Sequence, residues 1–310
     1  MACWGIEHGY KVFGTTYNYS TDEATSIVAE KLSDIEKLKG SKYIQAYTPD
    51  AIAKLIDIAT HNPSQKFMCI GTPCQMFGLS QLLAHKGIRN EVLYVDLFCH
   101  GVPSYLVWKP YIQQLRRRVG EIANINFRYK GNGWHQYSIR VLGQHGSYTR
   151  IAYADSFYRY FFDNVALNAS CYTCTLRKRH TAADIRIGDF LGPRFEHRED
   201  GISAVVAVTE QGQKIVNSLA AHHRITICGT YDAKEALQAQ STKDYTTRQL
   251  RDKTIERLRN GDIATTQQWY FKQLAPMARL RSRLKRLVAK LPNGVVVTLR
   301  RASRSIRGQE

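Results

Sequence analysis

Short apolar runs alternate with amphipathic stretches along the first 120 residues of the chain. The runs predict strands, and the stretches with apolar residues three and four positions apart predict helices. The predicted strands are GYKVFGTTYN, TSIVAEKL, KFMCIG and EVLYVDLF, and the predicted helices are TPDAIAKLIDIATH, the stretch from Met76 to His85, and PSYLVWKPYIQQLRRR. Thr48 and Ser104 are suited to cap two of these helices, and Pro49 suits a first helical turn. Strands separated by helices indicate a mainly parallel sheet with flanking helices.

The pattern changes from about Asn124. INFRYK and HQYSIRVLG flank Asn132-Gly133, which predicts a β-hairpin with a tight turn, and GSYTRIAY predicts a third strand. We therefore expect an antiparallel insertion at about 123–152 in an α/β fold. After an aromatic helix, DSFYRYFFDN, we expect the strands DIRIGDF, SAVVAVT and HRITIC, with a helix, EQGQKIVNSLAAHH, that Thr209 caps.

Two parts of the chain differ in character, an α/β domain over residues 1–230 and a helical, basic C-terminal extension over residues 231–310. The composition, with 44% hydrophobic and 23% charged residues, is that of a folded protein and excludes a mainly disordered chain. No apolar run approaches the roughly 18 residues that span a bilayer. The first ten residues, MACWGIEHGY, lack the basic start of a signal peptide, so we expect a cytoplasmic protein.

Positive charge is concentrated at the C-terminus. The net charge is +18, and residues 276–310 hold ten basic residues and one acid, which is half of that charge. In RLRSRLKRLVAKL, leucines recur at helical spacing between arginines and lysines. This pattern fits an amphipathic helix on an anionic membrane, which would place the protein peripherally at the inner face, and equally a solvated terminal helix. Nucleic acid is the less favoured partner, because no aromatic platform accompanies the charge.

Four of the seven cysteines have the spacing of metal ligands. Cys74 and Cys99 each follow an apolar strand, and loops that follow parallel strands meet at one sheet edge. Cys171 and Cys174 form a CxxC pair in a loop. Four thiolates suit tetrahedral zinc or an iron–sulfur cluster, and the spacing leaves both open. The other three are expected to be structural, in a core strand or on a helix face: Cys69, Cys228 and Cys3.

Several motifs agree in order with one known family. GTPCQMFGL, VDLFCHGVPS followed by Trp108, the CYTC pair and ADIRIGDFLG resemble the C-terminal domain of the coenzyme F420 hydrogenase/dehydrogenase β-subunit family, and GSKYIQ fits it too. The resemblance covers about residues 5–230 and implies an iron–sulfur flavoprotein oxidoreductase. It implies that a [4Fe–4S] cluster lies next to FAD, with these four ligands: Cys74, Cys99, Cys171 and Cys174.

The resemblance also implies partners and site residues. A deazaflavin such as F420, or a protein such as ferredoxin, would exchange electrons with the flavin, and bacterial surface-polysaccharide synthesis is a possible setting. His100 would bond cluster sulfide or shuttle a proton. The residues expected at flavin or substrate are Ser41, Lys42, Tyr43, Gln45, Gly71, Thr72, Pro73, Asp189 and Gly192. The structural alternatives are a linking loop for residues 41–45, a buried bonded histidine for His100 and a turn residue for Asp189.

Two departures from the family pattern bear on the flavin. Family members usually begin earlier, with a Ser/Gly-rich loop, whereas this chain opens at Met1 inside the helix that follows that loop. We therefore expect either a misplaced start or a truncation, and in both cases an incomplete FAD site. Leu191 stands where an aromatic residue is common. The alternative function is a non-catalytic scaffold or partner subunit with a structural metal, attached to membranes through its basic tail.

Overall fold

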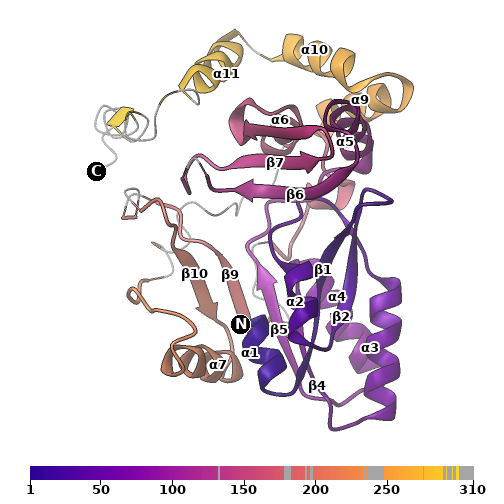
Figure 1. The fold of residues 1–310 in the computed structure, drawn as a ribbon, viewed down its shortest axis with the longest axis vertical. Coiled ribbons are helices and arrows are strands. Elements are labelled where there is room, and N and C mark those ends of the chain that lie inside the picture. Colours follow the sequence, from indigo (N-terminus) through magenta and orange to yellow (C-terminus); the bar gives the residue numbers. More distant parts are fainter. Residues whose placement is uncertain are drawn as a thin grey trace. The chain divides into compact units, whose positions relative to one another are not determined.

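The computed structural model describes residues 1–131, 133–177, 183–192, 194–195, 198–232, 235, 240, 248–274, 276–288, 291, 295 and 298–299. Contacts among them define two compact units, each assembled from separate stretches of chain (Figure 1). The first comprises Met1–His100, Thr173–Gly192 and Ile202–Asp244, and the second comprises Gly101–Tyr172, Pro193–Gly201 and Tyr245–Glu310. The boundary expected at residue 230 stays a prediction.

The first unit is built on a seven-stranded, mostly parallel sheet. Its strands are β1 (Tyr10–Asn18), β2 (Glu23–Ala29), β3 (Ala46–Tyr47), β4 (Lys66–Gly71), β5 (Val92–Leu97), β9 (Ile185–Asp189) and β10 (Ser203–Ala207). They are arranged in the order β10-β9-β5-β4-β1-β2-β3. The pairs β1–β4, β4–β5, β5–β9 and β2–β3 are parallel, while β1–β2 and β9–β10 are antiparallel. The predicted α/β fold with a mainly parallel sheet is therefore confirmed.

Helices cover both faces of this sheet. Successive side chains of the central strands point to opposite faces, and since both sets are apolar, each face must be covered. Val12 and Met68 belong to one apolar core, and their neighbours Phe13 and Cys69 belong to another on the opposite face. The helices of this unit are α1 (Ala2–Glu7), α2 (Leu32–Leu38), α3 (Pro49–His61), α4 (Pro73–His85) and α7 (Glu210–Ala221). Pro49 lies in the first turn of α3 as predicted, but Thr48 makes no side-chain cap there, whereas Thr209 caps α7.

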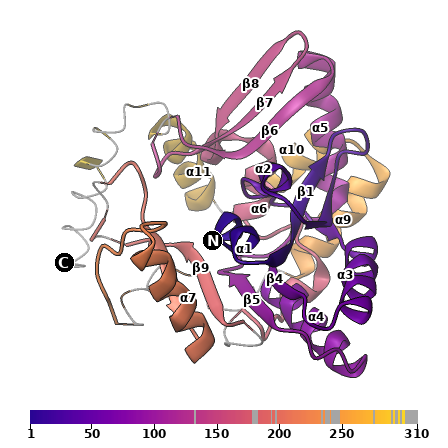
Figure 2. The same cartoon turned by 60° about the horizontal axis from the view of Figure 1, so that its bottom comes forward.

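The second unit combines a small antiparallel sheet with helices. Figure 2 shows its three strands as neighbours, β6 (Ile122–Tyr129), β7 (Ser138–Gly143) and β8 (Gly146–Ile151). The helices are α5 (Tyr105–Val119), α6 (Ser156–Phe162), α9 (Arg248–Asn260), α10 (Ile263–Gln273) and α11 (Pro276–Val288), with short 3-10 turns η1 (Ala152–Ala154) and η2 (Ala169–Cys171). Ser104 caps α5 as predicted. Within the described ranges, no helix is long and apolar enough to cross a membrane.

One local prediction holds in part and another is wrong. β6 and β7 are antiparallel as the predicted hairpin requires, and Gly133 N–H donates to the Lys130 carbonyl at 2.8 Å, but the connection is longer than a tight turn because it runs from residue 130 to residue 137; Asn132 lies outside the described residues. The two-residue turn joins β7 to β8, where Gly143 pairs with Gly146. The predicted strand HRITIC is not a strand. Ile225 packs against the core, but Cys228 is exposed rather than buried, because this segment does not pair with β10, the outermost strand of the sheet.

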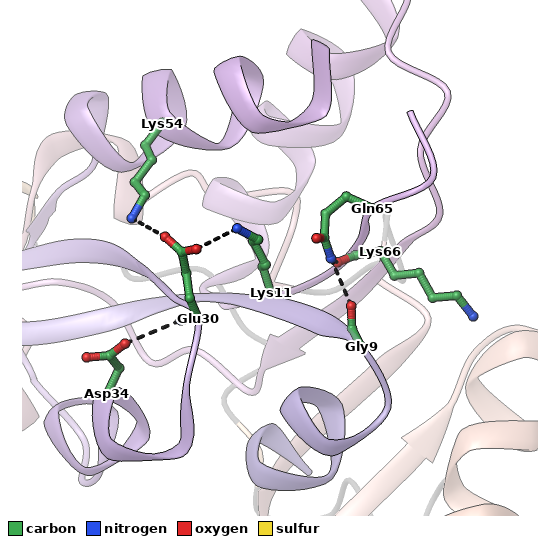
Figure 3. A network of polar contacts seen from close by, with 7 residues as sticks. All are labelled: Gly9, Lys11, Glu30, Asp34, Lys54, Gln65 and Lys66. Carbon is green, nitrogen blue, oxygen red and sulfur yellow. Dashed lines mark hydrogen bonds and ion pairs between the residues drawn. The ribbon is translucent and has the colours of Figure 1, made fainter. Parts of the chain in front are cut away.

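A polar network ties together the edge of the sheet at which β1 and β4 begin (Figure 3). Glu30 accepts hydrogen bonds from Lys11 Nζ at 2.5 Å and from Lys54 Nζ at 2.6 Å. Both bonds lower the pKa of the Glu30 carboxyl, and the bond with Lys11 has the larger effect. Gln65 Nε2 donates to the carbonyl oxygen of Gly9 at 2.8 Å. These polar groups are bonded within the chain, so this edge has a structural role.

A buried ion pair joins β5 to β9. The Arg186 guanidinium donates through Nε to Asp96 Oδ1 at 2.6 Å and through Nη2 to Oδ2 at 2.5 Å, and the two residues pair directly in the parallel ladder. Their side chains are 3% and 0% exposed. The guanidinium also lies over the Phe98 ring, 5.8 Å from its centroid. Two parallel charge-assisted bonds satisfy both charges where water does not reach.

We predict that Asp96→Asn lowers the free energy of unfolding by about 3–5 kcal/mol, because it leaves the Arg186 charge buried without a counter-charge. The double variant Asp96→Leu/Arg186→Met removes both charges and should lose less than the single variant. Glu36→Gln, which breaks the exposed Lys39–Glu36 pair, serves as the control and should cause no measurable loss. Urea denaturation measures each value. A loss for Asp96→Asn no larger than that for Glu36→Gln would contradict the role assigned to the pair.

Candidate functional site

Three parallel strands bring predicted site residues to one edge of the sheet. β4, β5 and β9 end at Gly71, Leu97 and Asp189, and the pairings of Gly71 with Asp96 and of Leu97 with Ile187 keep those ends at similar heights. The loops that follow carry Thr72–Cys74, Cys99 with His100, and Gly192. Ligands of open parallel sheets bind outside the carboxyl ends of the strands, so this edge is where a cofactor would be expected.

The segment Gly40–Gln45 enters the sheet at the same edge. Tyr17, near the end of β1, pairs with Ala24 of β2, which in turn pairs with Ala46 of β3. Since β1 runs parallel to β4, the residues just before β3 lie on the side at which β4 ends. Three strand spacings separate β3 from β4, about 14 Å at roughly 4.8 Å each. Only an elongated ligand would reach from the β4 loop to this segment.

Within that segment, the Lys42 side chain is engaged by the chain itself. Its Nζ donates to three carbonyl oxygens at the end of α2, of Lys37 at 3.4 Å, Leu38 at 3.0 Å and Lys39 at 2.9 Å. Burial lowers the pKa of the Lys42 ammonium to about 8. These bonds make Lys42 a C-terminal cap of α2, a role that the sequence analysis did not foresee. Ser41 and Gln45 are exposed, and Tyr43 is half-buried.

The start of α4 is locally fixed by its own residues. Thr72 and Gln75 form a capping box, in which Gln75 Oε1 accepts from both the backbone N and Oγ1 of Thr72 at 3.0 Å. A Cβ at Gly71 would lie 2.8 Å from the Met76 Cε and 3.0 Å from Gln75 Oε1, so the glycine allows this close packing. Thr72 N–H is thus bonded within the chain. Pro73 occupies the first helical turn.

Cys74 lies in the first turn of α4, exposed, with its Sγ 3.2 Å from Thr72 Oγ1. Cys99 lies two residues after the end of β5. Phe98, between them, donates its N–H to the Ile187 carbonyl at 3.0 Å and so extends the β5–β9 pairing by one residue. His100, next along, is half-buried and makes polar or ring contacts of its own. Two predicted thiol ligands therefore follow neighbouring strands, as the sequence predicted.

In the second unit, the segment that follows Cys99 pairs with the segment that leads to Cys171. Asn168 N–H donates to the Val102 carbonyl, and Ser104 N–H donates to the Ala166 carbonyl, both at 2.8 Å. A Cβ built on Gly101 would lie 2.8 Å from Leu167 Cδ1 and 3.6 Å from the Cβ of Cys171, and Gly101 has φ +142. Only glycine combines this backbone conformation with so close an approach. Cys171 is thus held beside a residue only two positions after Cys99.

The four predicted cluster ligands fit a thiolate-bound metal centre in their chemistry. All four are thiols outside any disulfide, Cys74 exposed and Cys99, Cys171 and Cys174 half-buried, whereas Cys69 is fully buried in β4 and burial raises the pKa of its thiol. Nevertheless, across the described part of the chain no three His, Cys, Asp or Glu side chains lie close enough together to hold one metal ion. The convergence of the four sulfur atoms stays a prediction.

Asp189 and Gly192 lie at the end of β9. The Asp189 carbonyl accepts from Gln240 Nε2 at 2.7 Å and from Leu191 N–H at 3.0 Å, and its backbone pairs with Ser203 of β10. The side chain is half-buried. These contacts fix the backbone at the strand end and agree with the structural alternative for Asp189, while its part in binding a flavin stays a prediction.

Sequence reasoning missed the polar residues inside the sheet. The Asp184 carboxylate accepts from Tyr94 N–H at 2.8 Å and from Thr209 Oγ1 at 2.7 Å, which ties β5 and the start of α7 to β9. Asp96 and Arg186 form the ion pair described above. The available signal was charge inside otherwise apolar strands, in VLYVDL and DIRIGD, since a buried charge requires a partner.

Comparison with known protein families agrees with the motifs. Residues 64–232 match the family that comprises the C terminus of the beta chain of coenzyme F420 hydrogenase/dehydrogenase. This match spans more than half of the chain, and the chain belongs to that family, which confirms the resemblance. The family description denotes subunits of oxidoreductases, and all four predicted cluster ligands fall within the matched residues.

The fold is also similar to that of a solved protein. A chain of the F420-reducing [NiFe] hydrogenase complex from Methanosarcina barkeri, studied as a xenon derivative, matches with a TM-score of 0.51 and 18% sequence identity. The match covers 83% of this chain and 81% of that chain. At this identity the similarity shows a shared fold. A comparison with curated proteins gave no match.

We predict that Thr72→Val lowers the free energy of unfolding by about 1 kcal/mol, because it removes the hydroxyl of the capping box at α4. Thr72→Ser keeps the hydroxyl and should lose little. Urea denaturation compares the two variants with the unaltered protein. An equal loss for serine and valine would show that the hydroxyl does not hold the start of α4.

Proposed function

We propose that the protein is an electron-transferring oxidoreductase subunit in which Cys74, Cys99, Cys171 and Cys174 hold a [4Fe–4S] cluster. The observation that carries the proposal is the placement of unbridged thiols after adjacent parallel strands, inside the part of the chain that matches the family. The pairing of the segments around Gly101 and Leu167 supports it, because it brings Cys171 close in space to the chain that leaves Cys99.

The surroundings of the thiols suit negatively charged sulfur ligands. Cys74 lies in the first turn of a 13-residue helix, where the positive end of the helix dipole favours an anionic ligand. The Thr72 hydroxyl lies 3.2 Å from Cys74 Sγ, and its one proton would turn from Gln75 Oε1 to the sulfur when Cys74 is a thiolate. Hydrogen bonds to ligand sulfur are one of the means by which a protein tunes the potential of a cluster.

FAD is proposed at the same sheet edge. When bound, it would accept two electrons together as hydride, whereas a cluster passes single electrons. Gly71, Thr72 and Pro73 would lie against it from the β4 loop, and Asp189 and Gly192 from the end of β9. Ser41, Tyr43 and Gln45 would contact a more distant part of an extended dinucleotide, while Lys42 would fix that segment by capping α2.

His100 is proposed as the residue that moves a proton. It directly follows Cys99 at the strand end, and histidine is the side chain suited to gain and lose a proton near neutral pH. The external electron partner is proposed to be a deazaflavin such as F420 or a redox protein such as ferredoxin. A cytoplasmic location and a substrate from surface-polysaccharide synthesis complete the proposal.

The competing function is a scaffold whose cysteines bind structural zinc. Zinc has no redox chemistry and no colour of its own, whereas a cluster absorbs broadly in the visible range. The absorption spectrum of anaerobically purified protein therefore distinguishes the two.

Replacing Cys74, Cys99, Cys171 or Cys174 with Ser should remove most of the bound iron, because each change deletes one cluster ligand. Cys3→Ser and Cys228→Ser are the matched controls, since both cysteines are exposed and outside the proposed ligand set, and they should retain iron. Iron per chain is measured after anaerobic purification, with circular dichroism to establish that each variant folds. Similar iron loss in ligand and control variants would refute the ligand assignment.

A specific observation favours a second, additional role for α11. Met277, Leu280, Leu284 and Leu287 are all exposed, by 49–62%, and their spacing places them along one stripe of the helix. Ten basic residues occur between Pro276 and the C-terminus, although residues 289–290, 292–294, 296–297 and 300–310 lie outside the described ranges. An apolar stripe with surrounding positive charge is complementary to an anionic membrane surface. We propose peripheral binding of α11 to such a membrane.

The triple variant Leu280→Gln/Leu284→Gln/Leu287→Gln should abolish flotation of the protein with vesicles that contain anionic lipid, because it removes the apolar contact. The control Tyr47→Gln/Ile227→Gln changes exposed apolar residues elsewhere and should float normally. Neutral vesicles should carry little of either protein, since the charge attraction is absent. Flotation of the triple variant equal to that of the unaltered protein would identify α11 as a solvated helix.

A further inference from the structure

The second unit contains a cavity of about 450 Å³ whose lining is largely polar. Residues of five elements line it, α5, β8, η1, α6 and α10. Its polar and aromatic lining includes Tyr111, Arg118, Tyr148, Arg150, Arg159 and Gln267. None of them belongs to the proposed cluster or flavin site. The volume is in the range of pockets that hold small molecules.

Positive charge dominates the cavity. Three arginines line its wall from separate elements, Arg118 from α5, Arg150 from β8 and Arg159 from α6. The one carboxylate in the wall is that of Asp155. Among side chains, guanidinium groups are the best suited to bind phosphate or carboxylate oxygens through paired hydrogen bonds. The cavity therefore favours a ligand that carries negative charge.

The carboxylate oxygens of Asp155 are already hydrogen-bonded within the chain. Its Oδ2 accepts from the hydroxyls of Tyr111 at 2.8 Å and Tyr148 at 2.9 Å, and its Oδ1 accepts from the backbone N–H of Phe157 at 2.9 Å and of Tyr158 at 3.2 Å. Asp155 is buried, and this burial raises the pKa of its carboxyl. Four donors from the chain thus take up its acceptor capacity, and the two tyrosine rings are fixed in the wall.

Aromatic rings hold the guanidinium groups of Arg118 and Arg159 in position. Arg118 lies over the Tyr148 ring, 5.4 Å from its centroid, and Arg159 lies over the Phe271 ring at 4.9 Å. Stacking of this kind limits the freedom of a guanidinium plane without using its N–H donors. Gln267 Nε2 donates to the Ser156 carbonyl at 3.4 Å, which joins α10 to the start of α6. The cations are therefore partly pre-organised before a ligand binds.

We propose that this cavity binds a small phosphorylated metabolite, a phosphate monoester carried on a polar ring such as a sugar or a nucleoside. The three guanidinium groups would hold the phosphate, and the tyrosine and glutamine side chains would contact the ring and its hydroxyl groups. The cavity volume fits one such molecule rather than a polymer. This inference is independent of the cluster, because it rests on residues of the second unit alone.

The test is isothermal titration calorimetry of the full chain with glucose 6-phosphate, adenosine 5′-monophosphate, inorganic phosphate and, as the uncharged control, glucose. We expect saturable binding of at least one phosphate monoester and no binding of glucose. Preference for glucose 6-phosphate or for adenosine 5′-monophosphate identifies the ring. Arg118→Gln and Arg150→Gln should each weaken binding about tenfold or more, the loss expected when one charge-assisted contact to phosphate is removed.

Arg117→Gln is the matched control, because Arg117 is exposed on the same helix as Arg118 and does not line the cavity. It should leave the Kd unchanged, which separates binding in the cavity from general attraction to a chain of charge +18. Arg118 and Arg150 are exposed too, so their replacement should leave the circular dichroism spectrum intact. Equal weakening by Arg117→Gln, or no saturable binding of either phosphate monoester, would overturn the proposal.

Discussion

Asp96 and Arg186 form the ion pair on which the arrangement of the first unit most depends. The two residues are 90 positions apart in sequence, yet they pair directly across β5 and β9 with both charges buried. A parallel pairing of such long range has no turn to set its register, and a shift would leave a charge without its partner in the interior. By fixing this register, the pair also fixes how β5 and β9 end, and hence where Cys99 and Asp189 stand.

The two edges of the sheet consequently have different roles. At the edge where β1 and β4 begin, the Glu30 network satisfies its polar groups within the chain. At the opposite edge the strands end in loops that carry unbridged thiols, a helix N-terminus and a histidine. The second unit adds a separate cationic cavity between its small sheet and its helices. An oxidoreductase subunit with this arrangement would keep electron transfer and recognition of a phosphorylated molecule on different groups of residues.

Most of the fold could be predicted from the sequence, because its strands are long apolar runs and its helices have clear periodicity. The predicted strand HRITIC failed because alternation alone does not supply a neighbouring strand, and Ile227 and Cys228 are exposed. Lys42 has backbone carbonyls as partners, which no side-chain motif reveals. The cavity lining includes Arg118, Arg150 and Gln267, which lie far apart in sequence and look locally like ordinary surface residues, so only the tertiary structure brings them together. Motif order predicted the family, and the strand pattern predicted that Cys74 and Cys99 follow strands of one parallel sheet. The closure of four sulfur atoms around one metal centre depends on loop conformation.

An iron–sulfur cluster held by the chain's own cysteines would be evident in the metal content of the protein. Iron, sulfide and zinc are measured in the unaltered protein after anaerobic purification, and electron paramagnetic resonance is recorded after reduction. We expect about four iron and four sulfide per chain and a signal typical of a reduced [4Fe–4S] cluster. Protein that contains zinc instead, or that takes up no iron even after anaerobic reconstitution with iron and sulfide, would rule out cluster binding.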